Sequence, residues 1–286
     1  MAPNDTGPHS YRKPFRQVLA DAVAEISASG YTSPERIQFW VEALRRAAEY
    51  DLGSETTVDR ETRAKMEAAF KRLLDGNKIT ELVPGVSRFN LSMLRPSLRA
   101  ELDRRIVASA DLIKLHRREA IEKTLSRFSG WSTSIPAGGD GTIDKREVRS
   151  SVGKSVAQLK FEARRVSVDQ GHKLIANISE IVAMDGGAIA GIWHDHGEHD
   201  SSYNARKEHL ERSKPGNNLF LVRDSWAIRD GLIRRGSRPY MDEIERPGQL
   251  TYCRCYYVFL TSPRRLPDDV LTARGHEWVS AGRVAA

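Results

Sequence analysis

Hydrophobic residues in the first part of the chain recur three or four positions apart, the spacing that predicts amphipathic helices. Residues 14–29 follow this pattern and are followed by a glycine, a common helix stop. Ser33 and Pro34 predict the start of a second helix that ends at Gly53, because a serine side chain caps free amides and proline suits the first helical position. A third helix is expected over residues 59–75. The three segments together predict a helical unit.

Longer helical segments follow. The apolar positions of residues 96–128 predict one long helix. Residues 131–145 are rich in Gly, Ser and Thr and are expected to form a linker. Residues 144–180 are expected to be helical, with breaks near Gly153 and Gly171 because glycine disfavours a helix interior.

The pattern changes after the glycine pair at 186–187. Three short segments, GAIAGIW, NLFLVR and TYCRCYYVFL, carry the alternating, β-branched and aromatic residues that are typical of strands. The predicted fold class is therefore α+β, with a helical N-terminal region that contains a long helix, followed by a small C-terminal α+β domain. Its sheet is expected to be antiparallel or mixed.

Changes in composition along the chain also predict how it is divided. Pro, Gly, Asn and Ser dominate the first residues, which indicates a tail without fixed structure. The expected parts are a disordered tail (1–13), a helical region (14–130), a linker (131–145), an α+β domain (146–262) and a C-terminal tail (263–286).

Composition excludes some classes of protein. The 286 residues are 40% hydrophobic and 29% charged, and no apolar run approaches the roughly 20 residues of a membrane span. The first residues lack the apolar segment of a secretory signal. We therefore expect no membrane span, and synthesis in the cytoplasm.

Charge adds a candidate partner. The net charge of +7 and the pI of about 9.5 favour acidic partners such as nucleic acid, although a basic soluble surface is the simpler explanation. The predicted long helix is the most basic segment, and its outer face could meet phosphates; the alternative is a solvated face with ion pairs four residues apart. The candidate phosphate contacts are Arg99, Arg104, Arg105, Lys114, Arg117 and Arg118.

The two cysteines suggest metal chemistry. Cys253 and Cys255 are two apart, so on a strand they share a face with Tyr257 and Phe259. Two thiolates on one face can reach one ion, and zinc is the metal that such ligands favour. The alternative is that both are small core residues, as free cysteines often are.

Histidines are concentrated in IWHDHGEHDSSYNARKEH, residues 192–209, which holds four of the eight. His209 together with His194, His199 or Asp200 could complete a tetrahedral structural zinc site that anchors this loop to the sheet. The predicted ligand set is His199, His209, Cys253 and Cys255.

The same loop has two other interpretations. Asp200, Arg206 and His209 could form a buried acid–arginine–histidine network that fixes the loop without any chemistry. A metal-dependent hydrolase or nuclease is the enzyme hypothesis, with Glu198 as the base beside an open coordination position. Its metal ligands would be drawn from His194, His196, His199, His209, Cys253 and Cys255.

The order of these features carries a family resemblance. A helix with ARRVSVDQGHKLIANISE precedes a strand that ends in Trp193; a D…R-x-x-H element, a Pro- and Gly-rich stretch and a Cys-Arg-Cys then follow. This order resembles the phage Mu F-type minor head, or head morphogenesis, family of tailed bacteriophages, over roughly residues 160–260. The residues that carry the resemblance are Trp193, Asp200, Arg206, His209, Cys253, Arg254 and Cys255.

The resemblance implies a low-copy structural protein of the virion, inside the head near the portal, and implies no enzymatic activity. Such a protein acts in head morphogenesis, genome packaging or DNA delivery. Its expected partners are the portal protein, the major capsid or other head proteins, and packaged DNA, with the helical region 14–130 as the docking part. A nucleic-acid-binding protein outside any virion is a third hypothesis, which lacks a base-reading motif.

Overall fold

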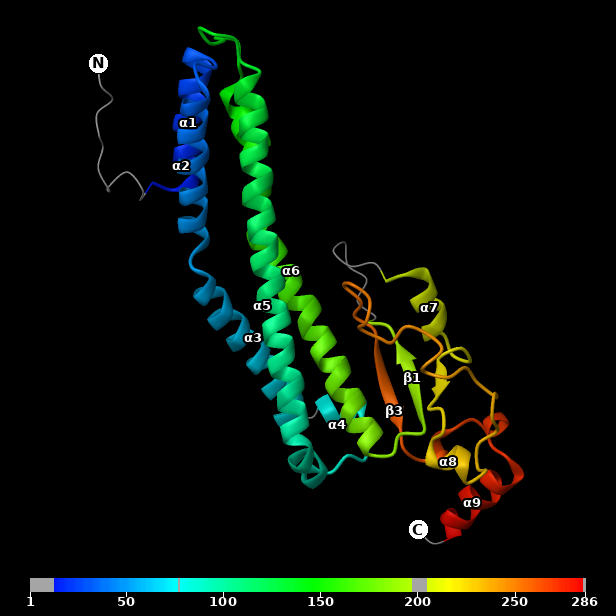
Figure 1. The fold of residues 1–286 in the computed structure, drawn as a ribbon. Helices are drawn as coiled ribbons and strands as arrows, with labels where there is room; N and C mark the ends of the chain where they lie inside the picture. The colour runs from blue at the N-terminus through cyan, green and yellow to red at the C-terminus, as the bar shows by residue number, and fades with distance from the viewer. Residues whose placement is uncertain (1–12, 77, 197–204, 285–286) are drawn as a thin grey trace. The chain divides into compact units, whose positions relative to one another are not determined.

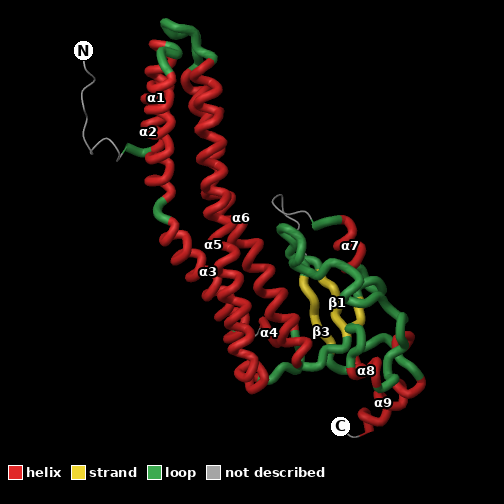
Figure 2. The backbone as a smooth tube through the Cα atoms, viewed as in Figure 1, coloured by secondary structure: helices red, strands yellow, loops and turns green. Residues whose placement is uncertain are grey.

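The computed structural model describes residues 13–76, 78–196 and 205–284. Figure 1 shows the elements along the chain, and Figure 2 separates helices from strands and loops. The helices are α1 (Phe15–Ser29), α2 (Pro34–Leu52), α3 (Glu55–Asp75), α4 (Lys78–Leu82), α5 (Arg88–Thr133), α6 (Lys145–Asp185), α7 (Lys207–Ser213), α8 (Trp226–Arg229) and α9 (Ala273–Val284). The strands are β1 (Ala190–His194), β2 (Leu219–Leu221) and β3 (Tyr256–Leu260), and the short 3₁₀ helices are η2 (Pro263–Arg265) and η3 (Asp268–Val270). The predicted α+β class is confirmed.

The chain divides into two compact units. Unit 1 comprises the described residues up to Thr62 together with Ala108–Val166, and unit 2 comprises Arg63–Val107 and the described residues from Ser167 onward. Helices α3, α5 and α6 each contribute to both units. The units therefore do not separate at residues 131–145, where the sequence predicted a linker.

Unit 1 is a helical bundle whose start follows the sequence prediction. The Ser33 side chain accepts a hydrogen bond from the backbone N–H of Arg36, 3.3 Å away, and so caps α2. Apolar residues of α1, α2, α5 and α6 form one core. Its buried members include Leu19, Val23, Leu44, Leu125, Phe128 and Val152.

The connection between α5 and α6 is held by backbone contacts. The N–H of Tyr31 donates to the carbonyl of Ile135 at 3.2 Å, and the N–H of Asp140 donates to that of Ser27 at 2.9 Å. Gly30 has φ +71°, and a Cβ there would lie 1.8 Å from the Pro136 carbonyl oxygen, so only glycine fits. The expected linker is an ordered turn packed on the end of α1.

Unit 2 contains a three-stranded antiparallel sheet in the order β2-β1-β3. Ala190 pairs with both Leu221 and Leu260, which fixes the register on either side of β1. Alternate side chains enter two cores, since successive residues of a strand point to opposite faces. Trp193, Phe220, Tyr257 and Phe259 pack with the helices of the unit, whereas Ala190, Leu219, Leu221 and Leu260 pack with α8 and the C-terminal segment.

Several predicted boundaries differ. Helix α5 begins at Arg88 and contains Pro96, and α6 runs through Gly153 and Gly171 without a break. A glycine costs a helix about 1 kcal/mol, which the packing of a long helix outweighs. Gly153 leaves room for the side chain of Leu19, because a Cβ added at Gly153 would lie 3.1 Å from Cδ2 of Leu19.

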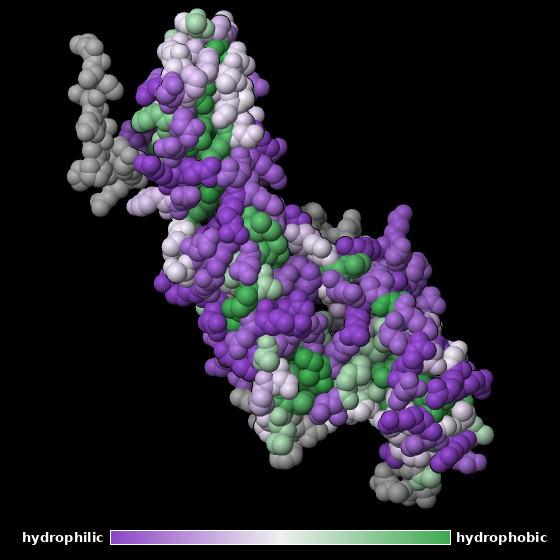
Figure 3. All heavy atoms as spheres, viewed as in Figure 1, coloured by the Kyte–Doolittle hydropathy of each residue, from purple (hydrophilic) through white to green (hydrophobic). Residues whose placement is uncertain are grey.

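The segment predicted as a C-terminal tail is part of the core of unit 2. Leu266, Val270, Leu271 and Val279 are buried against α8 and the sheet. Hydrophilic residues dominate the face seen in Figure 3, with apolar residues in smaller patches between them, as expected when apolar side chains turn inward. Within the described residues, no helix combines the length and apolar character needed to cross a bilayer.

Candidate metal centre

The Cys-x-Cys pair lies at the entrance to β3 and not within it. Cys253 and Cys255 belong to a segment without regular structure that follows a turn, and β3 starts at Tyr256. Among the described residues, the pairing of β1 with β3 ends at His194 and Tyr256. The segment before Tyr256, which holds both cysteines, is therefore not paired with β1. The predicted shared face is kept, because both cysteines are buried in the same core as Tyr257 and Phe259.

His209 of α7 meets both thiols. Its Nδ1 lies 3.4 Å from Sγ of Cys253 and 3.5 Å from Sγ of Cys255. The ligand atoms of the three residues lie within 4.8 Å of one another, and the exposed fractions of the residues are 1%, 1% and 3%. This His/Cys/Cys group could bind a metal ion.

The distances are compatible with one shared ion as well as with hydrogen bonds. A neutral imidazole nitrogen has one lone pair, so it cannot accept well from two thiols at once. In a tetrahedral zinc site with Zn–S near 2.3 Å and Zn–N near 2.0–2.1 Å, a sulfur and a nitrogen ligand stand about 3.6 Å apart. The observed S···N separations are 3.4 and 3.5 Å, so an ion would need little rearrangement.

The two thiols differ in acidity. The hydrogen bond from Cys255, together with those from backbone N–H groups, outweighs burial and leaves the pKa of Cys253 below its usual range. The same interaction and burial raise the pKa of Cys255. Gly248 supplies one of the N–H groups, donating to Sγ of Cys253 over 3.3 Å. The pair therefore favours one thiolate, the form that ligates metals.

A half-buried carboxylate stands on the other side of the imidazole. Nε2 of His209 lies 3.4 Å from Oε1 of Glu245, and Nη1 of Arg212 lies 2.9 Å from the same oxygen. Arg212 lowers the pKa of Glu245 to about 2. The Arg212 guanidinium also lies 5.4 Å from the centre of the Trp193 ring, and that ring meets His209 edge to face at 5.1 Å.

An acid–arginine–histidine network is therefore present at His209, and the one expected from Asp200, Arg206 and His209 stays a prediction. Arg206 precedes α7 and is exposed, and its Nη2 donates to the carbonyl of Thr251 at 3.1 Å. Among the described residues, Arg212 and Glu245 are the arginine and the acid beside His209. Asp200 and His199 lie outside the described residues, as does Glu198.

The remaining predicted residues lie around the site. Trp193 is fully buried and Arg254 is half-buried. Burial, followed by the charge of Arg254, lowers the pKa of His172.

His194 stacks on Tyr256 at 5.3 Å, and His196 contacts His172 edge to face at 6.1 Å. His194 and His196 do not belong to the His/Cys/Cys group.

Two further contacts hold the segments that carry the ligands. Asp169 is buried on α6 and accepts a 2.6 Å hydrogen bond from the N–H of Tyr252, next to Cys253. Lys173 lies 2.9 Å from the same carboxylate. These contacts fix the Cys-x-Cys segment to α6.

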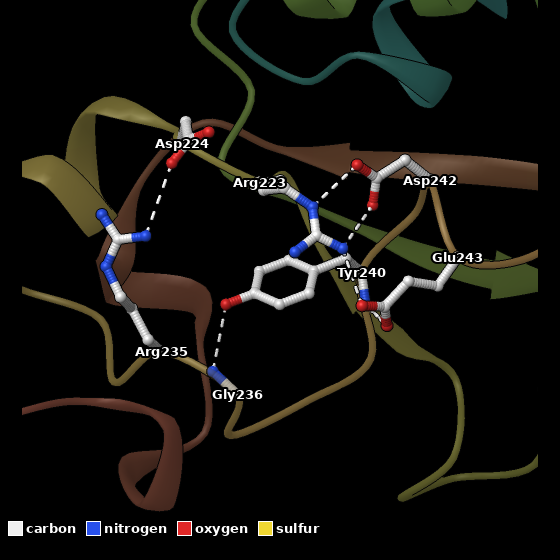
Figure 4. A network of polar contacts seen from close by, with 7 residues as sticks. All are labelled: Arg223, Asp224, Arg235, Gly236, Tyr240, Asp242 and Glu243. Carbon is white, nitrogen blue, oxygen red and sulfur yellow. Dashed lines mark hydrogen bonds and ion pairs between the residues drawn. The ribbon is translucent and has the colours of Figure 1, made fainter.

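Figure 4 shows the network that fixes the loop before Glu245. Arg223 donates to both carboxylate oxygens of Asp242, at 2.8 and 3.1 Å, and to Glu243 at 2.7 Å. Its guanidinium lies over the Tyr240 ring, 4.1 Å from the centroid, and the Tyr240 hydroxyl accepts from the N–H of Gly236. These groups are exposed and fully paired, so the network has a structural role.

Most of the basic residues predicted as phosphate contacts on α5 lie in ion pairs. Arg99 bonds to Glu67 at 3.0 Å, and Lys114 lies 2.6 Å from Asp59. The other pairs are Arg104 and Arg105 with Glu101, and Arg118 with Glu55. Arg117 is half-buried, which lowers its pKa. The face matches the alternative of a solvated helix with paired charges.

Comparison of the chain with protein-family models, with curated proteins and with solved structures finds no match. The resemblance to the minor head family therefore rests on the residues of this chain alone. Sequence reasoning missed Arg212 and Glu245. Arg212 is three residues after His209 and shares its helix face, which was a usable signal. Glu245 lies in an irregular loop and had none.

Proposed function

We propose that this chain is a structural minor head protein of a tailed bacteriophage, located inside the head near the portal. The observation that supports the proposal is the convergence of Trp193, His209, Cys253 and Cys255, which carry the family resemblance, in one buried cluster. These residues are far apart in the sequence, so their shared motif order has a physical basis: they form one packed site. The role in head morphogenesis, genome packaging or DNA delivery follows from the resemblance.

The cofactor of this site is a structural zinc ion. Two cysteines and a histidine are ligands that zinc prefers, and the S···N separations suit a tetrahedral ion. Zinc supplies bonds that connect α7 to the segment before β3, which no strand pairing joins among the described residues. A structural site also agrees with the burial of the three side chains.

The packing of two other histidines favours this role over the metal-dependent hydrolase, because His194 and His196 contact aromatic rings outside the His/Cys/Cys group. A hydrolytic site keeps a coordination position open to substrate and water. Here the three ligands are 1–3% exposed, and His194 and His196 pack against other rings. A structural site takes a fourth protein ligand, and His199, proposed for that position, lies outside the described residues.

The proposed partners are the portal protein, the major capsid or other head proteins, and packaged DNA. The experiment that tests the function is quantitative mass spectrometry of purified phage particles, counting copies of the chain per portal ring. A small number of copies, up to about a dozen, supports a minor head protein. Absence of the chain from particles overturns the proposal.

A further inference from the structure

The two ring nitrogens of His209 have different surroundings. Nδ1 faces the sulfur atoms of Cys253 and Cys255, whereas Nε2 faces Oε1 of Glu245. Resting on the zinc site proposed above, we infer that Glu245 is the positioning residue of this site: it holds His209 so that Nδ1, and not Nε2, binds a divalent, thiophilic ion.

The packing of the imidazole permits this orientation and no free rotation. The ring is 1% exposed and lies edge to face with Trp193, at 5.1 Å and 78°. Turning it over about the Cβ–Cγ bond would put the carbon atoms Cδ2 and Cε1 where Nδ1 and Nε2 now lie, so neither nitrogen would face its present neighbour. Only the present orientation points Nε2 toward the Glu245 carboxylate while the lone pair on Nδ1 is directed at the sulfur atoms.

The contact between Nε2 and Glu245 is longer than a hydrogen bond. The separation is 3.4 Å, and Nε2 is buried without a hydrogen-bond partner among the described residues. A metal on one ring nitrogen polarises the N–H on the other, and ligating histidines commonly donate that N–H to a carboxylate. An ion on Nδ1 therefore strengthens the long contact between the Nε2–H and Oε1 of Glu245.

Arg212 holds Glu245 for this task. It lies three residues after His209 on α7 and contacts both oxygens of the carboxylate, at 2.9 and 3.3 Å. The positive charge of Arg212 balances the negative charge of Glu245, and a divalent ion balances the two thiolates of Cys253 and Cys255. With the ion bound, these groups together are neutral, which lowers the free-energy cost of burying them.

The experiment compares the full-length protein with Glu245→Gln and with Glu243→Gln as the matched control. Glu243 is in the same loop but is about half-exposed and pairs with Arg223, away from His209. Zinc affinity is measured by competition with a chelator. Long-range ¹H–¹⁵N spectra of the histidine rings report which nitrogen binds the ion, with the His209 signals assigned from His209→Ala.

We expect one zinc ion per chain, an Nδ1-ligated His209 with the proton on Nε2, and a loss of affinity of about 10- to 100-fold in Glu245→Gln. Glu243→Gln should bind zinc like the wild type. The wild-type spectrum does not depend on Glu245→Gln, so it tests the inference even if that variant folds poorly.

The results separate the two proposals. Zinc binding through Nε2, or equal affinity in wild type and Glu245→Gln, overturns the role of Glu245 and leaves the zinc site standing. A wild-type protein that binds no zinc overturns both.

Discussion

Arg212 and His209 share one carboxylate oxygen: Oε1 of Glu245 lies 2.9 Å from Nη1 of Arg212 and 3.4 Å from Nε2 of His209. Arg212 and His209 come from one face of α7, and Glu245 comes from the loop between β2 and β3. The ion pair thus joins α7 to this loop at the position where the loop leads to Cys253. The stability of the loop and the geometry of the thiol site are therefore coupled.

Replacing Arg212 tests this coupling. Arg212→Met should lower the free energy of unfolding of the metal-free protein by about 1–3 kcal/mol, because it leaves a partly buried carboxylate without its cation. The measurement is urea denaturation in the presence of a chelator. Arg206→Met is the control, since Arg206 is exposed and, among the described residues, donates to the Thr251 carbonyl; it should change stability by no more than about 0.5 kcal/mol. Equal effects of the two substitutions would contradict the role given to Arg212.

Removing the metal distinguishes the proposed structural zinc site from the alternative, in which the two cysteines are only core residues. A chelator should lower the melting temperature of the zinc-loaded protein by roughly 5–10 °C, because the ion binds only the folded site. Cys255→Ser should abolish this difference, whereas His276→Ala, at an exposed position on α9, should keep it. If the chelator leaves the melting temperature of the wild type unchanged, the cysteines are core residues and the proposed zinc site is wrong.

The parts of the structure that local chemistry determines were predictable, and the parts that depend on distant contacts were not. Ser33 and Pro34 begin α2 as expected, because a cap needs only neighbouring residues. The start of β3 could not be predicted from TYCRCYYVFL, because Tyr256 is where pairing with β1 begins. Cys253, Cys255 and His209 were identified as a group by residue type, but Glu245 was not, since only the fold brings it to the imidazole.

Gly30 and Gly53 provide a paired test of the turn in unit 1. Both have φ +71° and ψ near 180°, a region almost restricted to glycine, so alanine at either position meets a similar backbone cost, about 1–3 kcal/mol. An added Cβ at Gly30 would also lie 1.8 Å from the Pro136 carbonyl oxygen, whereas at Gly53 nothing lies within 4 Å. Gly30→Ala should therefore reduce stability clearly more than Gly53→Ala, as measured by chemical denaturation. Equal losses would mean that the turn after α5 is not packed on α1 as described.

The ion pairs on α5 lead to a prediction about DNA. If Arg99, Arg104 and Arg118 bound phosphates, changing all three to Gln would reduce the dependence of log affinity on log salt by roughly 0.9 for each phosphate that is no longer neutralised. Their acidic partners, which include Glu67 and Glu101, already occupy these guanidinium groups. We therefore expect the affinity for double-stranded DNA and its salt slope to be unchanged in the triple variant, measured by fluorescence anisotropy over a range of salt concentrations. A slope reduced by about 3 would mean that DNA displaces the acids, and α5 would then be a DNA-binding face after all.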